Sequence, residues 1–435
     1  MTPIPMHGIA SRQDLPLPFE YVVAGAIIAL LVSFVLMFFG WPQRRYRERT
    51  GRRLGRVPTP VVWLGRIVVL AIYALAALAL IGGEDRLTNP IFGFVFAVVW
   101  VGLVPLSALF GPVWSVLNPI RTIHRGLSAL LRVKPEEGLF ALPARLGVWP
   151  ATLGLFAFAF FELVQPGRTT LPVMRLYVAV WFVVLIVGAV LFGSRWIAAA
   201  DPFEAYASTV AAGAPLQPTK DGAVQLMSPL AALSTWKPPP GTAGVVCVLL
   251  GSTAFDSFAN TSWWVRRIQD STLPYEIWGT GGLVVLTLIV AVSFVAACVA
   301  MAPVSRKGVT LAALPRLMAP SVAPILVGYA VAHYLTLLII EGQRTFINLS
   351  DPLGLGWNLF GTAELGVNTA MVMNPVPIAI MQAVAIVGGH IVGIVIAHER
   401  SLAILRSDRT VRGQVPMLAV MVCYTIAGLL LLFSP

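Results

Sequence analysis

The sequence is organised by ten apolar stretches, most of them long enough for an α-helix to cross a lipid bilayer. Only 11% of the 435 residues are charged, whereas a soluble globular chain is about 25% charged. Backbone groups inside a bilayer must bond to one another, which favours helices for such stretches. We therefore predict an all-α polytopic membrane helix bundle. The ten predicted helices lie near residues 19–41, 61–83, 90–117, 140–164, 171–194, 243–262, 276–302, 318–341, 376–398 and 415–433.

The basic residues predict the orientation of these helices. Of the 30 lysines and arginines, 21 lie in five alternate connections, and only six lie on the opposite side. Short loops rich in lysine and arginine stay in the cytoplasm. We therefore expect a multi-pass protein of the plasma membrane, with the basic side inside and both termini outside. The basic connections are 42–60, 118–139, 195–240, 303–317 and 399–414.

The formal net charge of +11 follows from the same asymmetry. The sequence contains no RNA-binding signature and no Cys/His finger. We therefore expect no nucleic-acid partner. The expected partners are the lipid bilayer and a small apolar substrate.

Long connections divide the chain. An inner loop at 195–242 separates helices one to five (19–194) from helices six to ten (243–435), and 1–18 is a short exposed segment. The inner loop contains DPFE, with Asp at N-cap, Pro at N1 and Glu at N3, which predicts a short helix on the cytoplasmic surface. An outer loop at 342–375 contains aromatic and leucine residues, and we expect it to form an ordered cap.

Two segments of the chain resemble each other. FGPVWSVLNP (110–119) and FGSRWIAAADP (192–202) each close an inward-running helix and end in a capping residue followed by proline. A duplicated helix pair would explain the likeness, because internal symmetry is common in membrane proteins. The alternative explanation is that cytoplasmic helix ends often have similar sequences without any duplication.

Asp256 and His333 are the polar residues that most suggest a site within the membrane. An ionisable side chain in a bilayer is costly unless it faces a partner or a cavity. Asp256 lies about 9 Å below the outer end of its predicted helix, with Asn260 one turn further on. His333 lies about 12 Å below Glu341, at a similar depth. We expect the two side chains to approach within one bridging ion or water, in a polar cavity that opens outward beneath the outer loop. The alternative is that these side chains have only a structural role and form hydrogen bonds that hold neighbouring helices together.

These residue types predict a catalytic or metal site. Imidazole and carboxylate ligands suit zinc or a similar divalent ion. We predict Asp256, His333 and Glu341 as catalytic residues, and the same three with His390 as metal ligands. His390 is deeper, about 21 Å from the start of its predicted helix, and joins the site if that helix begins later.

Other ionisable residues are expected at the margins. Glu162, at the outer end of its helix, can contribute from the side. His124 and His398 are expected at the cytoplasmic surface among arginines. His7 and Asp14 precede the first helix on the outer side, where His7 and nearby methionines would suit copper.

Five separated stretches resemble a group of bacterial, often actinobacterial, membrane proteins known as fenitrothion hydrolases. The resemblance covers almost the whole chain and implies cleavage of an organophosphorus triester at the membrane. It supplies no list of catalytic residues. The stretches are HGIASRQDLPLP (7–18), LLGSTAFDSF (249–258), VAHYLTLLIIEGQRTFINLSDP (331–352), NLFGTAE (358–364) and VGGHIVGIVIAHERSL (387–402).

Three functions therefore remain open. A membrane hydrolase would use a bound divalent metal to activate water and to stabilise charge on a phosphoryl oxygen. A transporter or proton-coupled carrier would use Asp256 and His333 as proton or ion sites, as helices broken by Gly and Pro suggest. An outer-face copper-handling factor would use His7 and the methionines near it.

Overall fold

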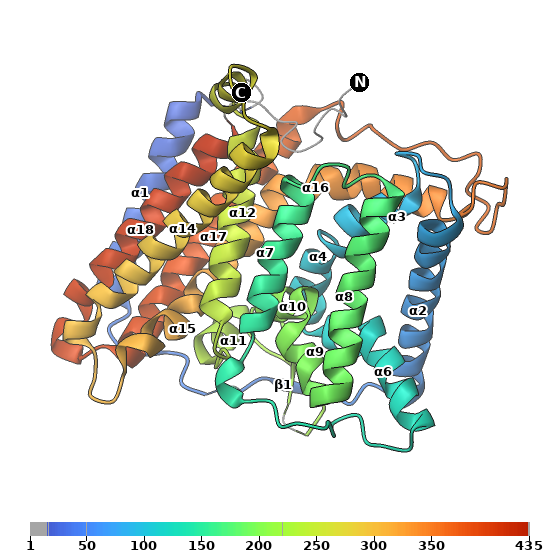
Figure 1. The fold of residues 1–435 in the computed structure, drawn as a ribbon. Coiled ribbons are helices and arrows are strands. Elements are labelled where there is room, and N and C mark those ends of the chain that lie inside the picture. The colour runs from blue at the N-terminus through green and yellow to red at the C-terminus, as the bar shows by residue number, and fades with distance from the viewer. Residues whose placement is uncertain (1–14, 16, 49, 220, 434–435) are drawn as a thin grey trace.

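Ten helices in the described part of the chain are long and apolar enough to cross a membrane, as predicted. The structure is a computed structural model that describes residues 15, 17–48, 50–219 and 221–433. The spans are α1 (Phe19–Gly40), α2 (Thr59–Gly82), the Pro90–Phe110 segment, the Ala144–Leu163 segment with α7 (Trp149–Leu163), α8 (Leu171–Phe192), α12 (Thr242–Ala259), the Tyr275–Val304 segment with α14 (Tyr275–Ala300), α16 (Ala323–Asn348), α17 (Pro375–Ile404) and α18 (Thr410–Leu432). Figure 1 shows them side by side in one bundle.

The third span is not a uniform helix. It consists of α3 (Pro90–Gly93), the π-helix η2 (Phe94–Val99) and α4 (Leu103–Phe110). A π-helix holds more residues per turn than an α-helix and often marks a functional region. Here it packs against α16.

Several predicted spans have different ends in the structure, and two of them show why. The fourth was expected to begin near 140, but α7 begins at Trp149, because Gly147 takes a left-handed conformation (φ +49°) that a continuous helix cannot contain. The eighth was expected at 318–341, but α16 runs on to Asn348, and its first turn carries a proline. Its outer end therefore stands about 10 Å further out than predicted.

The five basic segments gather at one face of the bundle, as predicted. A small antiparallel sheet joins β1 (Arg52–Gly55), β3 (Val224–Leu226) and β2 (Leu216–Pro218) in that order. An isolated bridge pairs Ser305 with Leu405. In Figure 1 this face is at the bottom, while the start of α1 and the end of α18 are at the top. That the basic face is cytoplasmic stays a prediction.

Short helices fill the connections. They are α5 (Val113–Leu117), α6 (Pro119–Leu130), α9 (Arg195–Ala200), α10 (Pro202–Ala211), α11 (Pro229–Thr235), α13 (Ser262–Gln269) and α15 (Leu314–Met318), with 3₁₀ turns η3 (Ala144–Leu146), η4 (Ala302–Val304), η5 (Leu311–Ala313), η6 (Ala319–Ser321) and η7 (Ser407–Arg409).

The helix predicted from DPFE is present as α10, but its predicted surface position is wrong. All of its residues except Ser208 are buried, and its Phe203 and Tyr206 rings pack on Phe158 and Trp100 of the membrane spans. The helix is largely apolar on every side, which favours burial over a surface position. It therefore re-enters the bundle from the basic face.

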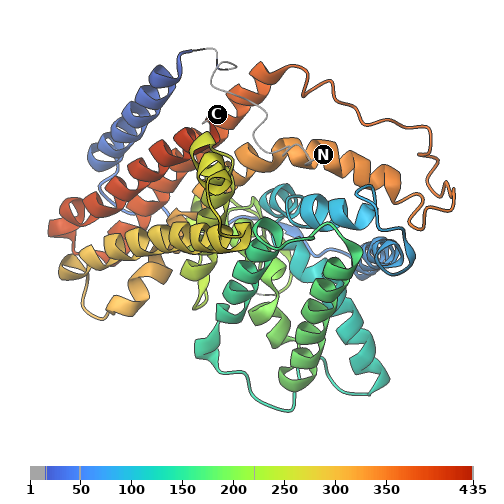
Figure 2. The ribbon, with the colours of Figure 1, turned by 45° about the horizontal axis from the view of Figure 1, so that its top comes forward.

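The α16–α17 connection does not form a packed cap. Its side chains Leu355, Trp357, Leu359 and Phe360 are exposed. Figure 2 shows the connection running along the edge of the bundle opposite α1. It borders a polar pocket of about 440 Å³ that includes Glu84 and Asp351. Asp256 does not line that pocket, and its expected position beneath this loop stays a prediction.

Candidate functional site

Asp256 of α12 and His333 of α16 are in direct contact. The Asp256 Oδ2 to His333 Nε2 distance is 2.9 Å, and both residues are buried, at 6% and 2% exposure. The predicted proximity of these two side chains is therefore confirmed, and their contact needs no bridging group. Both side chains are ionisable and would be costly against lipid, and the contact gives each of them a polar partner.

Asn260 does not share this contact, although it lies one turn from Asp256. Its side-chain Nδ2 donates to the backbone oxygen of Asp256 (2.8 Å) at the end of α12. Helix ends leave carbonyl groups unbonded, and this amide satisfies one of them. Asn260 thus holds the last turn that presents Asp256.

Three further side chains complete a hydrogen-bonded chain around the pair. Tyr334 donates its hydroxyl to Asp256 Oδ2 (3.1 Å). On the other side of the imidazole, Ser257 Oγ lies 3.3 Å from His333 Nδ1 and 2.8 Å from the Tyr329 hydroxyl. The order Tyr334–Asp256–His333–Ser257–Tyr329 is continuous and fully buried. We name it the α12–α16 chain.

Ser257, Tyr329 and Tyr334 were not predicted from the sequence. Tyr329 is four residues before His333, so it lies on the same helix face, and its ring stacks on the imidazole (18° between planes). Tyr334 follows His333 directly, and its ring meets the imidazole edge-on. The four-residue spacing of Tyr329 from His333 could have predicted this contact. The position of Tyr334 could not, because adjacent residues of a helix do not face each other.

The direction of hydrogen bonding can reverse along this chain. When the imidazole is neutral with its proton on Nε2, Nδ1 accepts from the Ser257 hydroxyl. When the imidazole is protonated, Nδ1 donates to Ser257, whose hydroxyl turns toward Tyr329. Hydroxyl groups are both donors and acceptors, so His333, Ser257 and Tyr329 each keep a partner in both states. The tautomers are assigned from this network of contacts.

Glu341 is turned away from the pair. It lies eight residues beyond His333 on α16, about 12 Å along the helix, and its Oε1 accepts from Arg344 Nη1 (2.6 Å). A metal ion is bound at about 2 Å, so one ion cannot reach both residues. The structure therefore separates Glu341 from the predicted set.

His390 of α17 lies on the inner side of the chain. Its Nδ1 donates to the backbone oxygen of Ile386 (2.8 Å), so Nε2 is the acceptor. That Nε2 is buried and has no partner among the described residues. His390 and Tyr329 both line a cavity of about 70 Å³ between α12, α14, α16, α17 and α18. His390 thus borders the α12–α16 chain without touching Asp256.

Glu162 of α7 is buried, at 7% exposure, and interacts electrostatically with Asp256. In the described ranges, no three His, Cys, Asp or Glu side chains lie close enough together to hold a metal ion. His7 and Asp14 lie outside the described residues. The structure therefore brings together two of the four predicted ligands.

His398 and His124 are not surface residues, contrary to expectation. His398 is 3% exposed, with Nδ1 near Gln414 Oε1 (2.9 Å) and Nε2 near the Trp41 carbonyl (2.8 Å). The reason is that α17 continues six residues beyond its predicted end and is covered by α1 and α18. His124 is also buried on α6, and burial lowers its pKa.

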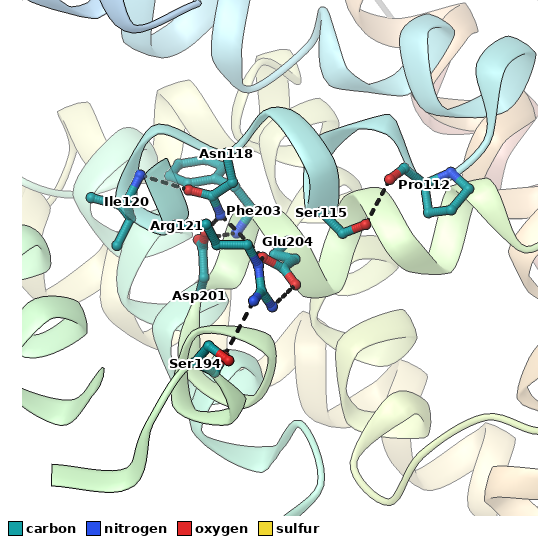
Figure 3. A network of polar contacts seen from close by, with 9 residues as sticks. All are labelled: Pro112, Ser115, Asn118, Ile120, Arg121, Ser194, Asp201, Phe203 and Glu204. Carbon is teal, nitrogen blue, oxygen red and sulfur yellow. Dashed lines mark hydrogen bonds and ion pairs between the residues drawn. The ribbon is translucent and has the colours of Figure 1, made fainter. Parts of the chain in front are cut away.

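A second buried polar network lies where the two similar segments meet (Figure 3). Asn118 caps α6 through Ile120 N, and Asp201 caps α10 through Phe203 N. Asn118 Nδ2 also donates to Asp201 Oδ2 (2.7 Å). Arg121 closes the network with a two-pronged ion pair to Glu204. The capping residues of the two similar segments are thus bonded to each other.

Comparison of the chain with protein-family models, with curated proteins and with solved structures finds no match in any of the three. The polar chemistry of the α12–α16 chain is therefore what a functional proposal has to rest on.

Proposed function

We propose that the protein is a proton-coupled membrane carrier and that Asp256 and His333 form its proton-binding pair. The observation that carries the proposal is the continuous hydrogen-bonded chain through both residues, buried between two membrane-spanning helices. Ionisable residues at such positions typically serve proton relays in pumps and transporters.

The hydrogen bonds around the pair suit both the neutral and the protonated form of the imidazole. The carboxylate oxygen that faces His333 also accepts from Tyr334, so it has two donors when it is charged. On protonation of the imidazole, Ser257 and Tyr329 reorient without losing a partner. A proton can therefore be added or removed without leaving a buried group unbonded, which would be costly.

His390 extends the route toward the basic face. The cavity of about 70 Å³ between His390 and Tyr329 has room for about two water molecules. Such waters would join His390 Nε2 to the Tyr329 hydroxyl. The proton path then runs from His390 through Tyr329 and Ser257 to the Asp256–His333 pair.

Infrared difference spectroscopy of the reconstituted protein between low and high pH tests the proposal without knowledge of the solute. A carboxyl or imidazole band that titrates in the wild type should disappear in Asp256→Asn. Glu341→Gln is the matched control, because it removes a carboxylate of α16 that pairs with Arg344 and lies outside the α12–α16 chain. Identical difference spectra for wild type and Asp256→Asn would overturn the proposal.

Hydrolysis is a second candidate, favoured by one further relationship. Ser257, His333 and Asp256 stand in the order nucleophile, base and acid, with contacts of 3.3 and 2.9 Å, as in serine hydrolases. In this protein Asp256 contacts Nε2 of the imidazole and Ser257 contacts Nδ1. The two ring nitrogens therefore have the opposite roles to those in serine hydrolases. A small apolar ester or phosphotriester would be the substrate.

Release of nitrophenolate from diethyl 4-nitrophenyl phosphate by the purified protein tests this candidate. Activity that Ser257→Ala abolishes would favour the hydrolase over the carrier. A catalytic zinc takes three protein ligands, and Asp256 with His333 supplies two of them. Elemental analysis of wild type and His333→Ala measures whether a divalent metal binds through this pair.

A further inference from the structure

An apolar cavity of about 260 Å³ lies between α2, η2, α6 and α8, away from Asp256. We name it the lateral chamber. Its wall on α2 includes Ala74, Ala76 and Ala77, whose small side chains leave the space. The facing wall on α8 includes Tyr177, Trp181 and Phe182.

The chamber is closed at its outer end. Arg175 of α8 donates to the last carbonyl groups of α2, with Nε 2.7 Å from Leu80 O and Nη2 3.0 Å from Ile81 O. These are groups that a helix end leaves unbonded. The clamp fixes the distance between α2 and α8 at this level.

The inner end is closed by the network in Figure 3. Ile120 and Phe203 line the chamber, and their backbone N–H groups are held by Asn118 and Asp201 (2.9 and 3.0 Å). Ala74, Ala77 and Phe182 are exposed on the membrane-facing surface. Since both ends are closed, the chamber opens sideways, into the bilayer between α2 and α8.

Two polar atoms in the walls point to a ligand. The Tyr73 hydroxyl and the Trp181 indole N–H belong to lining residues, are buried, and have no partner among the residues that the structure describes. Buried polar groups in proteins are nearly always hydrogen-bonded. A hydroxyl and an indole N–H are both donors, and a carbonyl-type oxygen can accept from either.

We infer that the lateral chamber binds a neutral lipophilic molecule that carries a hydrogen-bond-accepting oxygen and enters from the bilayer. A volume of about 260 Å³ corresponds to on the order of ten non-hydrogen atoms. The apolar walls exclude ions and strongly polar solutes. A plain hydrocarbon chain would fill the space but leave both donors unbonded.

Photolabelling with benzophenone tests the inference. Benzophenone is an apolar aromatic ketone of suitable size, and on illumination it reacts with neighbouring C–H bonds. In the reconstituted protein, saturable labelling should map by mass spectrometry to residues 70–80 and 177–182. Diphenylmethane, which lacks the ketone oxygen, should compete roughly 5- to 10-fold less well than unreactive ketones of the same size, as expected for a lost hydrogen bond.

Three variants complete the test. Ala77→Phe fills the lateral opening and should abolish saturable labelling, whereas Val187→Phe, at a lipid-exposed position of α8 outside the chamber, should leave it unchanged. Tyr73→Phe should weaken labelling by roughly 5-fold. Labelling that does not saturate, or that Ala77→Phe leaves intact, would overturn the site. Equal competition by diphenylmethane would overturn the requirement for an accepting oxygen.

Discussion

The side-chain amide of Asn118 donates to the carboxylate of Asp201 (2.7 Å), and each of these two residues caps the helix that follows it. Both residues are fully buried. The bond therefore joins two helix starts, 83 residues apart in the chain, at the basic face. Any change at either residue affects both helices and the contact between them.

Asn118→Ala should destabilise the protein by about 2 kcal/mol, since it removes a helix cap and one donor to a buried carboxylate. Thermal unfolding in detergent measures this as a melting temperature lower by a few degrees. Asp221→Ala is the control, because Asp221 forms an exposed ion pair with Arg53 and such pairs contribute little. Equal decreases in melting temperature for the two variants would show that the bond between Asn118 and Asp201 adds no stability beyond that of an exposed ion pair.

Stability should depend on pH through Asp201. Burial, and then the charge of Glu204, raises the pKa of Asp201 from 3.8 to about 7. The folded protein then holds a proton that the unfolded chain releases, so this contribution is present below pH 3.8 and is lost as the pH rises toward 7. The melting temperature of the wild type relative to Asp201→Asn should therefore fall between pH 5 and pH 8. A difference that stays constant over this range would contradict the assignment.

The adjacent glycines of α17 should respond in opposite ways to substitution. A Cβ on Gly389 would lie 2.6 Å from the Pro324 backbone oxygen, where α17 crosses α16, whereas a Cβ on Gly388 would meet nothing within 4 Å. Gly389→Ala should force the two helices apart and lower the melting temperature by several degrees. Gly388→Ala should be neutral or slightly stabilising, because alanine favours the helix by about 1 kcal/mol.

Ser257→Ala should interrupt the α12–α16 chain while leaving the Asp256–His333 contact in place. In liposomes loaded with a pH-sensitive dye, proton flux driven by a membrane potential should be lost, and Ser257→Thr should restore part of it by returning a hydroxyl. Ser252→Ala is the control on the same helix, since its buried hydroxyl donates to Leu249 O (3.2 Å), a backbone group of its own helix. Unchanged flux in Ser257→Ala would remove this serine from the path.

The membrane spans were predictable because their signal is local. An apolar stretch of sufficient length has few alternatives in a bilayer, so their number and approximate positions followed from the sequence. The ends were less predictable, because a proline or a left-handed glycine moves a helix start without changing hydropathy. This is why α7 and α16 begin later than expected.

The candidate site was only partly predictable. Matched depth suggested that Asp256 and His333 meet, because depth follows from counting residues along a helix. Which side chains share a contact also depends on how each helix is rotated about its axis, and packing alone sets that rotation. Tyr334 and Ser257, each next in sequence to a member of the pair, join it for this reason. Glu341, on the expected face, instead turns to Arg344.

The buried contact of Trp41 with Glu399 has a consequence for the order of assembly. Trp41 follows α1, and its indole N–H donates to Glu399 near the end of α17 (2.6 Å), 358 residues later in the chain. The main contacts of α1 are with α17 and α18. During synthesis the first helix is therefore made long before the two helices that it will pack against. A chain truncated before α17 would leave α1 without these partners.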